Sequence, residues 1–165
     1  MSVHTRPYYP ADEAACLKVF DSNVPKYFST EEREEFKTFL KLPSCVYLVL
    51  EQSGQIVGCG GYYVHQEGGQ GDLCWGMVRR ELHGTGLGKR LLLERLGRIV
   101  QNPQVTSIRL DTSQHTRGFF AKLGFVTLAI VPNGYGPSLD RYNMRLSLDE
   151  AARKRIQTAC QEVQP

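Results

Sequence analysis

The pattern of hydrophobic and polar positions predicts several strands in the first half of the chain. Runs rich in β-branched and aromatic residues occupy 45–51, 55–65 and 71–78, and glycine-containing turns separate them. We expect these runs to form consecutive antiparallel strands, with a short strand at 2–6 before them. Segments 10–20 and 29–40 read as helices with acidic first turns, the second capped by Ser29 or Thr30.

The pattern changes after residue 78, where helices and strands alternate. A leucine-rich helix is expected over 87–100, followed by a strand at 106–111, a helix at 113–123, strands at 125–131 and 141–148, and a last helix at 148–163. Gly124 before Phe125 suits a Schellman cap, and Ser147 with Glu150 offers a capping box. The fold class is therefore mixed α/β, with a sheet of about seven strands, an antiparallel N-terminal part and a later βαβ crossover.

Length and composition favour one domain. A chain of 165 residues, 41% of them hydrophobic, suffices for one core, so we expect a single domain over 1–165 in which 148–162 is a C-terminal helical extension. The net charge is +3, and Lys and Arg are dispersed instead of forming a basic block, which argues against nucleic acid as a partner. The first residues lack a signal-like apolar segment and no run is long enough for a membrane span, so we expect a cytoplasmic protein.

The five cysteines are odd in number and widely spaced, without a CxxC pair. This spacing argues against a disulfide framework and against a metal site. We expect most of them to be buried as small apolar side chains.

Three glycines at alternate positions, Gly84, Gly86 and Gly88, stand directly before the leucine-rich helix. The first N–H groups of a helix have no partner within it and lie at the positive end of its dipole. A bare glycine turn feeding a helix is therefore a ready site for an anion, above all a phosphate.

Two common phosphate motifs fit this stretch poorly. A Walker A loop needs Ser or Thr after Gly-Lys, but Arg90 follows Lys89, and His83 stands where its first glycine belongs. A dinucleotide fingerprint needs glycine where Lys89 stands, and such fingerprints usually open the first βαβ unit. Asp111, at the end of the next strand, keeps nicotinamide-dinucleotide binding open as the less favoured alternative.

The run from His83 to Gly88, after a strand ending in Met77-Val78, resembles the Arg/Gln-x-x-Gly-x-Gly/Ala signature of the GNAT superfamily of N-acetyltransferases. The later run FFAKLGF, from Phe119 to Phe125, resembles the family's helix that ends in Tyr-x-x-x-Gly-Phe. The order of elements agrees from about residue 3 to 148. The resemblance implies helices on both faces of the sheet, and transfer of an acetyl group from acetyl-CoA to a primary amine by direct attack on the thioester.

The resemblance also implies where the coenzyme binds. Backbone N–H groups of the glycine turn would hold the pyrophosphate, Val78 would bond the pantetheine arm, and a bulge at Gly76 would help part its strand from a parallel neighbour. His83 departs from the usual Arg or Gln. The expected coenzyme-binding residues are Met77, Val78, His83, Gly84, Thr85, Gly86, Leu87, Gly88, Lys89, Ser113, Phe119 and Phe120.

The chemistry needs a base for the ammonium and an acid for the leaving thiolate. Some relatives use a glutamate eleven positions before the signature, which corresponds to Asp72 here. His65 and Glu67 are alternative bases. The tyrosine that often serves as the acid is replaced by Phe120, which leaves Tyr135 as the first candidate, with Tyr142 and the weaker His115 as alternatives. This departure also keeps open a coenzyme-binding domain that has lost catalysis.

The acceptor is either a small-molecule amine or a peptide amine. Aromatic side chains are the candidates for its pocket: Tyr27, Phe28, Tyr62, Tyr63, Trp75 and Tyr135. GNAT proteins often dimerise, so a homodimer is a further expectation from the resemblance.

Overall fold

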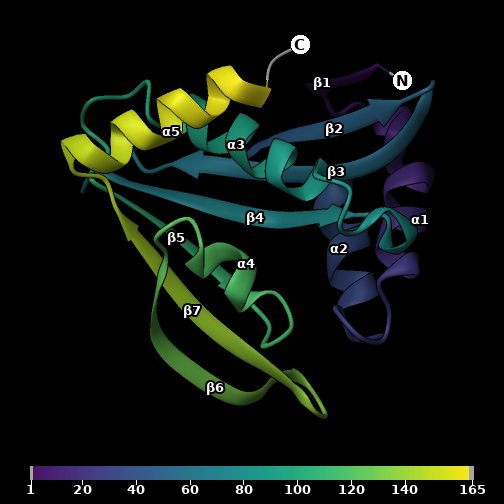
Figure 1. Ribbon diagram of the computed structural model, residues 1–165. Coiled ribbons are helices and arrows are strands. Elements are labelled where there is room, and N and C mark those ends of the chain that lie inside the picture. The colour runs from purple at the N-terminus through teal and green to yellow at the C-terminus, as the bar shows by residue number, and fades with distance from the viewer. Residues whose placement is uncertain (1, 164–165) are drawn as a thin grey trace.

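One seven-stranded sheet forms the centre of the molecule (Figure 1). The computed structural model describes residues 2–163, and the strand order is β1-β2-β3-β4-β5-β7-β6. Neighbouring strands are antiparallel except β4 and β5, which are parallel. The mixed sheet and its antiparallel first half confirm the sequence prediction. The strands are β1 (Val3–Pro7), β2 (Val46–Gln52), β3 (Gln55–Val64), β4 (Gln70–Val78), β5 (Ser107–Thr112), β6 (Val126–Gly136) and β7 (Leu139–Ser147).

Helices cover both faces of the sheet, as expected. Val49 and Ile56 pack in a cluster with α1 and α2, whereas their chain neighbours Leu50 and Val57 pack with α3, because successive strand residues point to opposite faces. The helices are α1 (Glu13–Ser22), α2 (Glu32–Lys41), α3 (Leu87–Ile99), α4 (Arg117–Ala121) and α5 (Glu150–Val163), with short 3-10 turns η1 (Pro10–Asp12) and η2 (Arg80–Leu82).

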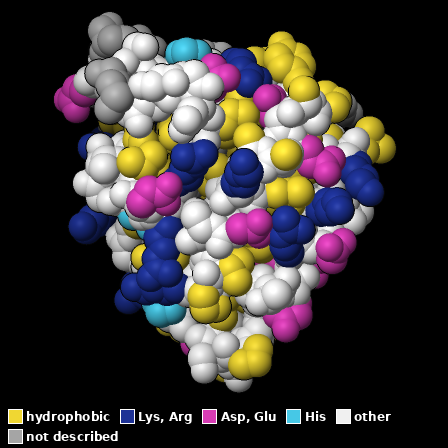
Figure 2. All heavy atoms as spheres, turned by 90° about the vertical axis from the view of Figure 1, so that its right-hand side faces the viewer, with side chains coloured by type: hydrophobic (Ala, Val, Ile, Leu, Met, Phe, Trp, Pro, Cys, Tyr) yellow, Lys and Arg dark blue, Asp and Glu magenta, His cyan; other side chains and the backbone are white. Residues whose placement is uncertain are grey.

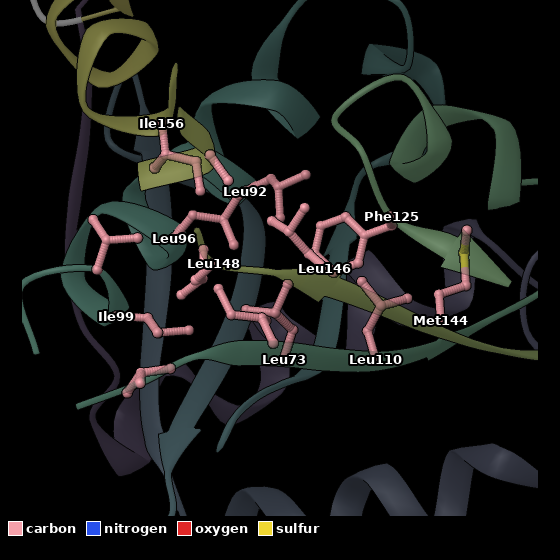
Figure 3. Packing of buried hydrophobic residues seen from close by; sticks show 14 residues of the cluster. Leu73, Leu92, Leu96, Ile99, Leu110, Phe125, Met144, Leu146, Leu148 and Ile156 are labelled. Atoms are coloured by element: carbon pink, nitrogen blue, oxygen red, sulfur yellow. The ribbon is translucent and has the colours of Figure 1, made fainter. Parts of the chain in front are cut away.

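The largest apolar cluster lies between the sheet, α3 and α5 (Figure 3). Leu92, Leu96 and Ile99 of α3 are fully buried there against strand residues and Ile156 of α5. Burying one such side chain contributes roughly 2 kcal/mol relative to leaving it exposed. The C-terminal helix is therefore packed into the core through α3. No helix within residues 2–163 has the length and apolar character to cross a membrane.

Two predicted helix starts are wrong. The helix expected over 113–123 begins only at Arg117, because the carbonyl oxygen of Ser113 accepts the N–H groups of Thr116 and Arg117 in a preceding turn. The last helix begins at Glu150, and Oδ1 of Asp149, not Ser147, caps it by accepting the N–H of Ala152 at 2.7 Å. Ser147 ends β7 instead.

Other boundaries also differ. The first expected helix splits into η1 and α1, and α2 begins at Glu32 with neither Ser29 nor Thr30 as its N-cap. The Schellman cap at Gly124 is confirmed: Gly124 has φ +100°, its N–H reaches the carbonyl of Ala121, and the N–H of Phe125 reaches that of Phe120. The hairpin of β6 and β7 is longer at its turn than expected, reaching Gly136 and Leu139.

The feature that positions the site is the short pairing of β4 with β5. These strands pair only from Gln70–Asp72 to Ser107–Arg109 and then part (Figure 1). Beyond that point β4 continues along β3 and β5 continues along β7. On the face drawn in Figure 2, Lys and Arg side chains are interspersed with Asp and Glu over most of the surface, and a few of them lie together at the lower left.

Candidate active site

A β-bulge interrupts β4 shortly after it parts from β5. The register with β3 shifts between Cys59 and Gly61, so that Trp75 and Gly76 together oppose Gly60. Trp75 has φ +45°, and Gly76 is exposed. The bulge predicted at Gly76 is therefore present. A bulge disrupts the ladder locally and leaves an extra residue unpaired.

The glycine turn follows the end of β4 and opens outward. Gly84 and Gly86 have φ +79° and +90°, which side-chain-bearing residues rarely adopt, and a Cβ on either would meet nothing within 4 Å. Gly86 is the N-cap of α3, and no side chain of residues 2–163 caps this end of the helix. Thr85 turns back and donates to the carbonyl of Leu82 at 2.6 Å. The first N–H groups of α3 thus meet the requirement for an anion site.

His83 is turned toward β4. Its Nε2 lies 3.0 Å from the carbonyl oxygen of Val78, which also accepts Nδ2–H of Asn23 at 2.9 Å. Because a carbonyl can only accept, the contact fixes the proton on Nε2 of His83. The ring of Tyr27 lies against His83, with centroids 4.9 Å apart, and against His115 at 6.0 Å. Tyr27 therefore links the glycine turn to the loop after β5.

The segment around α4 forms the other side of the site. Ser113 is buried and its hydroxyl accepts the N–H of His115. Phe119 is exposed, and its ring lies 3.8 Å from where a Cβ on Gly88 would stand, which places α4 beside the start of α3. Phe120 packs on Phe125 in the core, so this position supplies no hydroxyl.

Two of the candidate bases form one unit. Nε2 of His65, just after β3, lies 2.5 Å from Oδ2 of Asp72, whose Oδ1 accepts Nε2–H of Gln70 at 2.7 Å. Asp72 is the last β4 residue paired with β5, so the unit lies where the strands part. Glu67 is exposed in the intervening turn. Sequence reasoning named His65 and Asp72 as alternatives and did not foresee their contact.

The acid candidate Tyr135 is half-buried on β6. Burial raises the pKa of its phenol well above the usual value, and the carboxylates of Asp111 and Glu32 raise it further, while Arg141 opposes them. Tyr142 lies on β7, where the guanidinium of Arg117 stacks on its ring. Tyr135 is therefore a protonated hydroxyl close to the end of β5.

The aromatic residues expected to line one pocket are divided by the sheet. Tyr62 packs in the cluster under α3, whereas Trp75 and Phe28 stack on each other in the cluster under α1 and α2. Tyr63 is exposed beside His65. The expectation of a single pocket wall is therefore wrong. Tyr63 is exposed near the candidate base, and the half-buried Tyr27 lies beside His83 at the glycine turn.

Two features escaped the sequence reasoning. Sγ of Cys45 lies 3.1 Å from Sγ of Cys74 across Gly61, and hydrogen bonding from Cys45 lowers the pKa of Cys74, as does the nearby cation of Arg95. Arg95 itself is buried in α3. An arginine on the leucine face of that helix was the signal available in the sequence. No group of three or more potential metal ligands occurs within residues 2–163.

Three features define an acetyltransferase-type α/β protein, the class that the sequence resemblance implied. They are parallel strands that part beyond Asp72, a bulge on one of these strands, and a glycine turn that leads into a helix. The chain belongs to the acetyltransferase (GNAT) family, whose model matches residues 16–125.

Relatives and solved structures agree with this assignment. An IAA acetyltransferase from Azospirillum brasilense is 34% identical over 102 residues, which make up 59% of this chain and 65% of that protein. A GNAT-family protein from Desulfovibrio desulfuricans has a TM-score of 0.74 at 22% identity, covering 88% of this chain and 99% of that one. The ribosomal-protein-S18-alanine N-acetyltransferase from Escherichia coli has a TM-score of 0.73 at 18% identity, covering 90% and 95%. These two structures share the fold.

Proposed function

We propose that the protein transfers an acetyl group from acetyl-CoA to the nitrogen of a primary amine. The observation that carries the proposal is the placement of the open glycine turn and the start of α3 at the end of β4, after β4 has parted from β5. Family membership gives the reaction class, and an aminoglycoside 6'-N-acetyltransferase of the same fold, with a TM-score of 0.67, was solved in complex with coenzyme A.

The turn fits the coenzyme phosphates. Gly84 and Gly86 have positive φ angles and lead directly into α3, whose first N–H groups belong to Leu87, Gly88 and Lys89. A Cβ on either Gly84 or Gly86 would meet no atom within 4 Å, so the space in front of the turn is open. Their partial positive charge suits a pyrophosphate. The carbonyl of Val78 is already engaged by Asn23 and His83, so a bond from Val78 to the pantetheine arm is left to its N–H group.

The pair of His65 and Asp72 acts as the base. Asp72 accepts Nε2–H of His65, which fixes the tautomer and leaves Nδ1 with the lone pair that takes a proton from the acceptor ammonium. The neutral amine nitrogen then attacks the thioester carbonyl carbon and forms the C–N bond of a tetrahedral intermediate. This intermediate collapses as the C–S bond breaks, and the nitrogen releases its second proton to solvent. Tyr135, held in its protonated form, donates to the departing thiolate.

The acceptor is an amine of a small molecule or of a peptide. Both classes occur among proteins of this fold, since one neighbour acetylates an alanine of ribosomal protein S18 and another an aminoglycoside. The exposed Tyr63, beside His65, and the half-buried Tyr27, beside His83, are the aromatic side chains that would contact it.

One observation favours a second function, a coenzyme-binding domain without catalysis: Phe120 has no hydroxyl where the family often has its acid. Calorimetric titration with acetyl-CoA, coenzyme A and NAD⁺, combined with thiol release over an amine panel, separates these functions. Acetyl-CoA binding with thiol release supports transfer, and binding without release supports the degenerate domain. Binding of NAD⁺ alone would overturn both.

A further inference from the structure

A guanidinium lies buried beneath the bulge of β4. Arg95 of α3 is 4% exposed, its Nε donates to the carbonyl of Leu91 and its Nη1 to the carbonyl of Gly61, both at 3.3 Å. Within residues 2–163 it forms no ion pair with a carboxylate, and its Nη2 donates to no other group. One charged donor is thus left without a partner.

Two glycines make room for this cation. A Cβ on Gly60 would lie 3.0 Å from Cζ of Arg95, and a Cβ on Gly76 would lie 2.7 Å from Nη2 and 2.8 Å from Nη1. A Cβ on Gly76 would therefore displace the guanidinium, whereas glycine leaves it room at the bulge. The bulge is what brings Gly76 beside Gly60. The unpartnered Nη2 therefore faces the exposed backbone of Gly76.

No carboxylate of residues 2–163 is among the charged or titratable groups that act on Arg95. Its neighbours are the thiols of Cys74, Cys45 and Cys59 and the phenol of Tyr47, and burial lowers the pKa of Arg95. A guanidinium nevertheless remains charged at neutral pH. A buried cation without an anion is costly, and an anion that arrives only during a reaction would relieve that cost.

We propose that Arg95 is a catalytic residue whose Nη2–H binds the thioester carbonyl oxygen of the acyl-CoA at the β4 bulge. When the amine nitrogen bonds to the carbonyl carbon, the C=O π electrons move to this oxygen, and the guanidinium holds the negative charge. When the C–S bond breaks, the electrons return to form the amide carbonyl, the thiolate leaves, and the attached nitrogen releases its second proton to solvent. The proposal rests on the proposed function and adds to it the group that stabilises the charge.

Arg95→Met tests the proposal, with Arg98→Met as control, because Arg98 is exposed on the same helix. We expect Arg95→Met to lower kcat for acetyl transfer by about 10²-fold. We expect its Kd for coenzyme A, which has no thioester, to stay within about threefold of wild type. Arg98→Met should match wild type in both. A folded Arg95→Met with wild-type kcat, or with a Kd for coenzyme A that rises as much as kcat/KM falls, would overturn the proposal.

Because Arg95→Met removes a buried side chain, a second readout uses Arg95→Lys, which keeps a charged donor, and the wild-type protein. The infrared stretch of a ¹³C-labelled thioester carbonyl should move to lower frequency in the wild-type complex than in water, and by less with Arg95→Lys. An equal or absent shift in both proteins would contradict a bond from Arg95. Wild-type protein that neither binds nor uses acetyl-CoA would defeat the proposed function itself, which is a distinguishable result.

Discussion

Nε2 of His65 lies 2.5 Å from Oδ2 of Asp72, so an imidazole that follows β3 and a carboxylate of β4 form one hydrogen-bonded pair. The pair lies at the last residue that β4 shares with β5. A carboxylate that orients an imidazole gives a positioned proton acceptor, which is what amine acetylation needs.

Asp72→Asn and His65→Gln should each lower kcat by about 10²-fold while leaving the KM for acetyl-CoA nearly unchanged, because the pair acts on the amine and not on the coenzyme. The double variant should be little slower than either single one, since the two side chains act as a unit. Steady-state thiol release measures all three.

Glu67→Gln is the control for this prediction, because Glu67 is an exposed carboxylate in the turn between His65 and Asp72. Its rate should equal wild type. If Glu67→Gln were slow while Asp72→Asn and His65→Gln kept wild-type rates, Glu67 would be the base.

Gly86→Ala should weaken acetyl-CoA binding about tenfold, because the N-cap at φ +90° would strain an alanine by about 1–2 kcal/mol and distort the first N–H groups of α3. Gly54→Ala is the matched control: Gly54 has φ +74°, its Cβ would meet nothing within 4 Å, and it lies in the turn between β2 and β3.

Both alanine variants should lose similar thermal stability, but only Gly86→Ala should lose affinity in a calorimetric titration. Equal affinities of the two variants for acetyl-CoA would exclude the turn as the phosphate site.

Tyr135→Phe should lower kcat about tenfold, since it removes the hydroxyl proposed to protonate the thiolate. Burial raises the pKa of Tyr135, so the hydroxyl stays protonated through neutral pH. Any change of the wild-type kcat with pH near neutrality should therefore be the same in Tyr135→Phe. Tyr142→Phe is the comparison, and loss of activity in Tyr142→Phe alone would transfer the role to that residue.

The sequence predicted the fold class, the sheet's antiparallel first half and the bulge at Gly76, because each depends on local periodicity or on one unusual residue. It failed at helix starts, where Asp149 outcompetes Ser147 through a hydrogen bond that periodicity does not reveal. It also treated His65 and Asp72 as alternative bases, because a contact between two strands depends on their register, which the sequence pattern does not show. The guanidinium of Arg95 lies against Gly60 and Gly76, and the bulge that brings these two glycines together is a matter of strand register, not of local pattern.

Asp12→Asn should lower the free energy of unfolding in a pH-dependent way, because it removes an ion pair that connects β1 to η1. Nη1 and Nη2 of Arg6 donate to the two oxygens of Asp12 at 2.8 and 2.9 Å, and this lowers the pKa of Asp12. The lowered pKa means that the pair stabilises the fold above the unfolded pKa of about 3.9, and that this stability disappears as pH falls through the folded pKa.

We expect Asp12→Asn to lower the free energy of unfolding by about 2 kcal/mol at pH 7, with a much smaller difference near pH 2. Urea unfolding at both values measures this. Asp21→Asn, which breaks an exposed pair with Arg33, should change little at either pH. A constant deficit for Asp12→Asn across pH would show that the carboxylate's charge is not the cause.

The edge strand β6 is the surface on which we expect a homodimer to form. Val126, Leu128, Ile130 and Val131 are 58%, 48%, 50% and 40% exposed, and β6 carries no charged residue from end to end. Such an edge is a template for pairing with another strand. Sedimentation should show a dimer for wild type and a monomer for Ile130→Lys, while Leu42→Lys, at an exposed leucine elsewhere, should remain dimeric. A monomeric wild type would contradict this.

The most direct test of the account is transfer of a labelled acetyl group. The protein is incubated with [¹³C]acetyl-CoA and a panel of small-molecule and peptide amines, and thiol release and amide products are measured together by absorbance and mass spectrometry. We predict one labelled amide for each thiol released, with at least one amine of the panel. Coenzyme binding without any amide product, or thiol release that is independent of amine, would contradict amine acetylation as the function of this site.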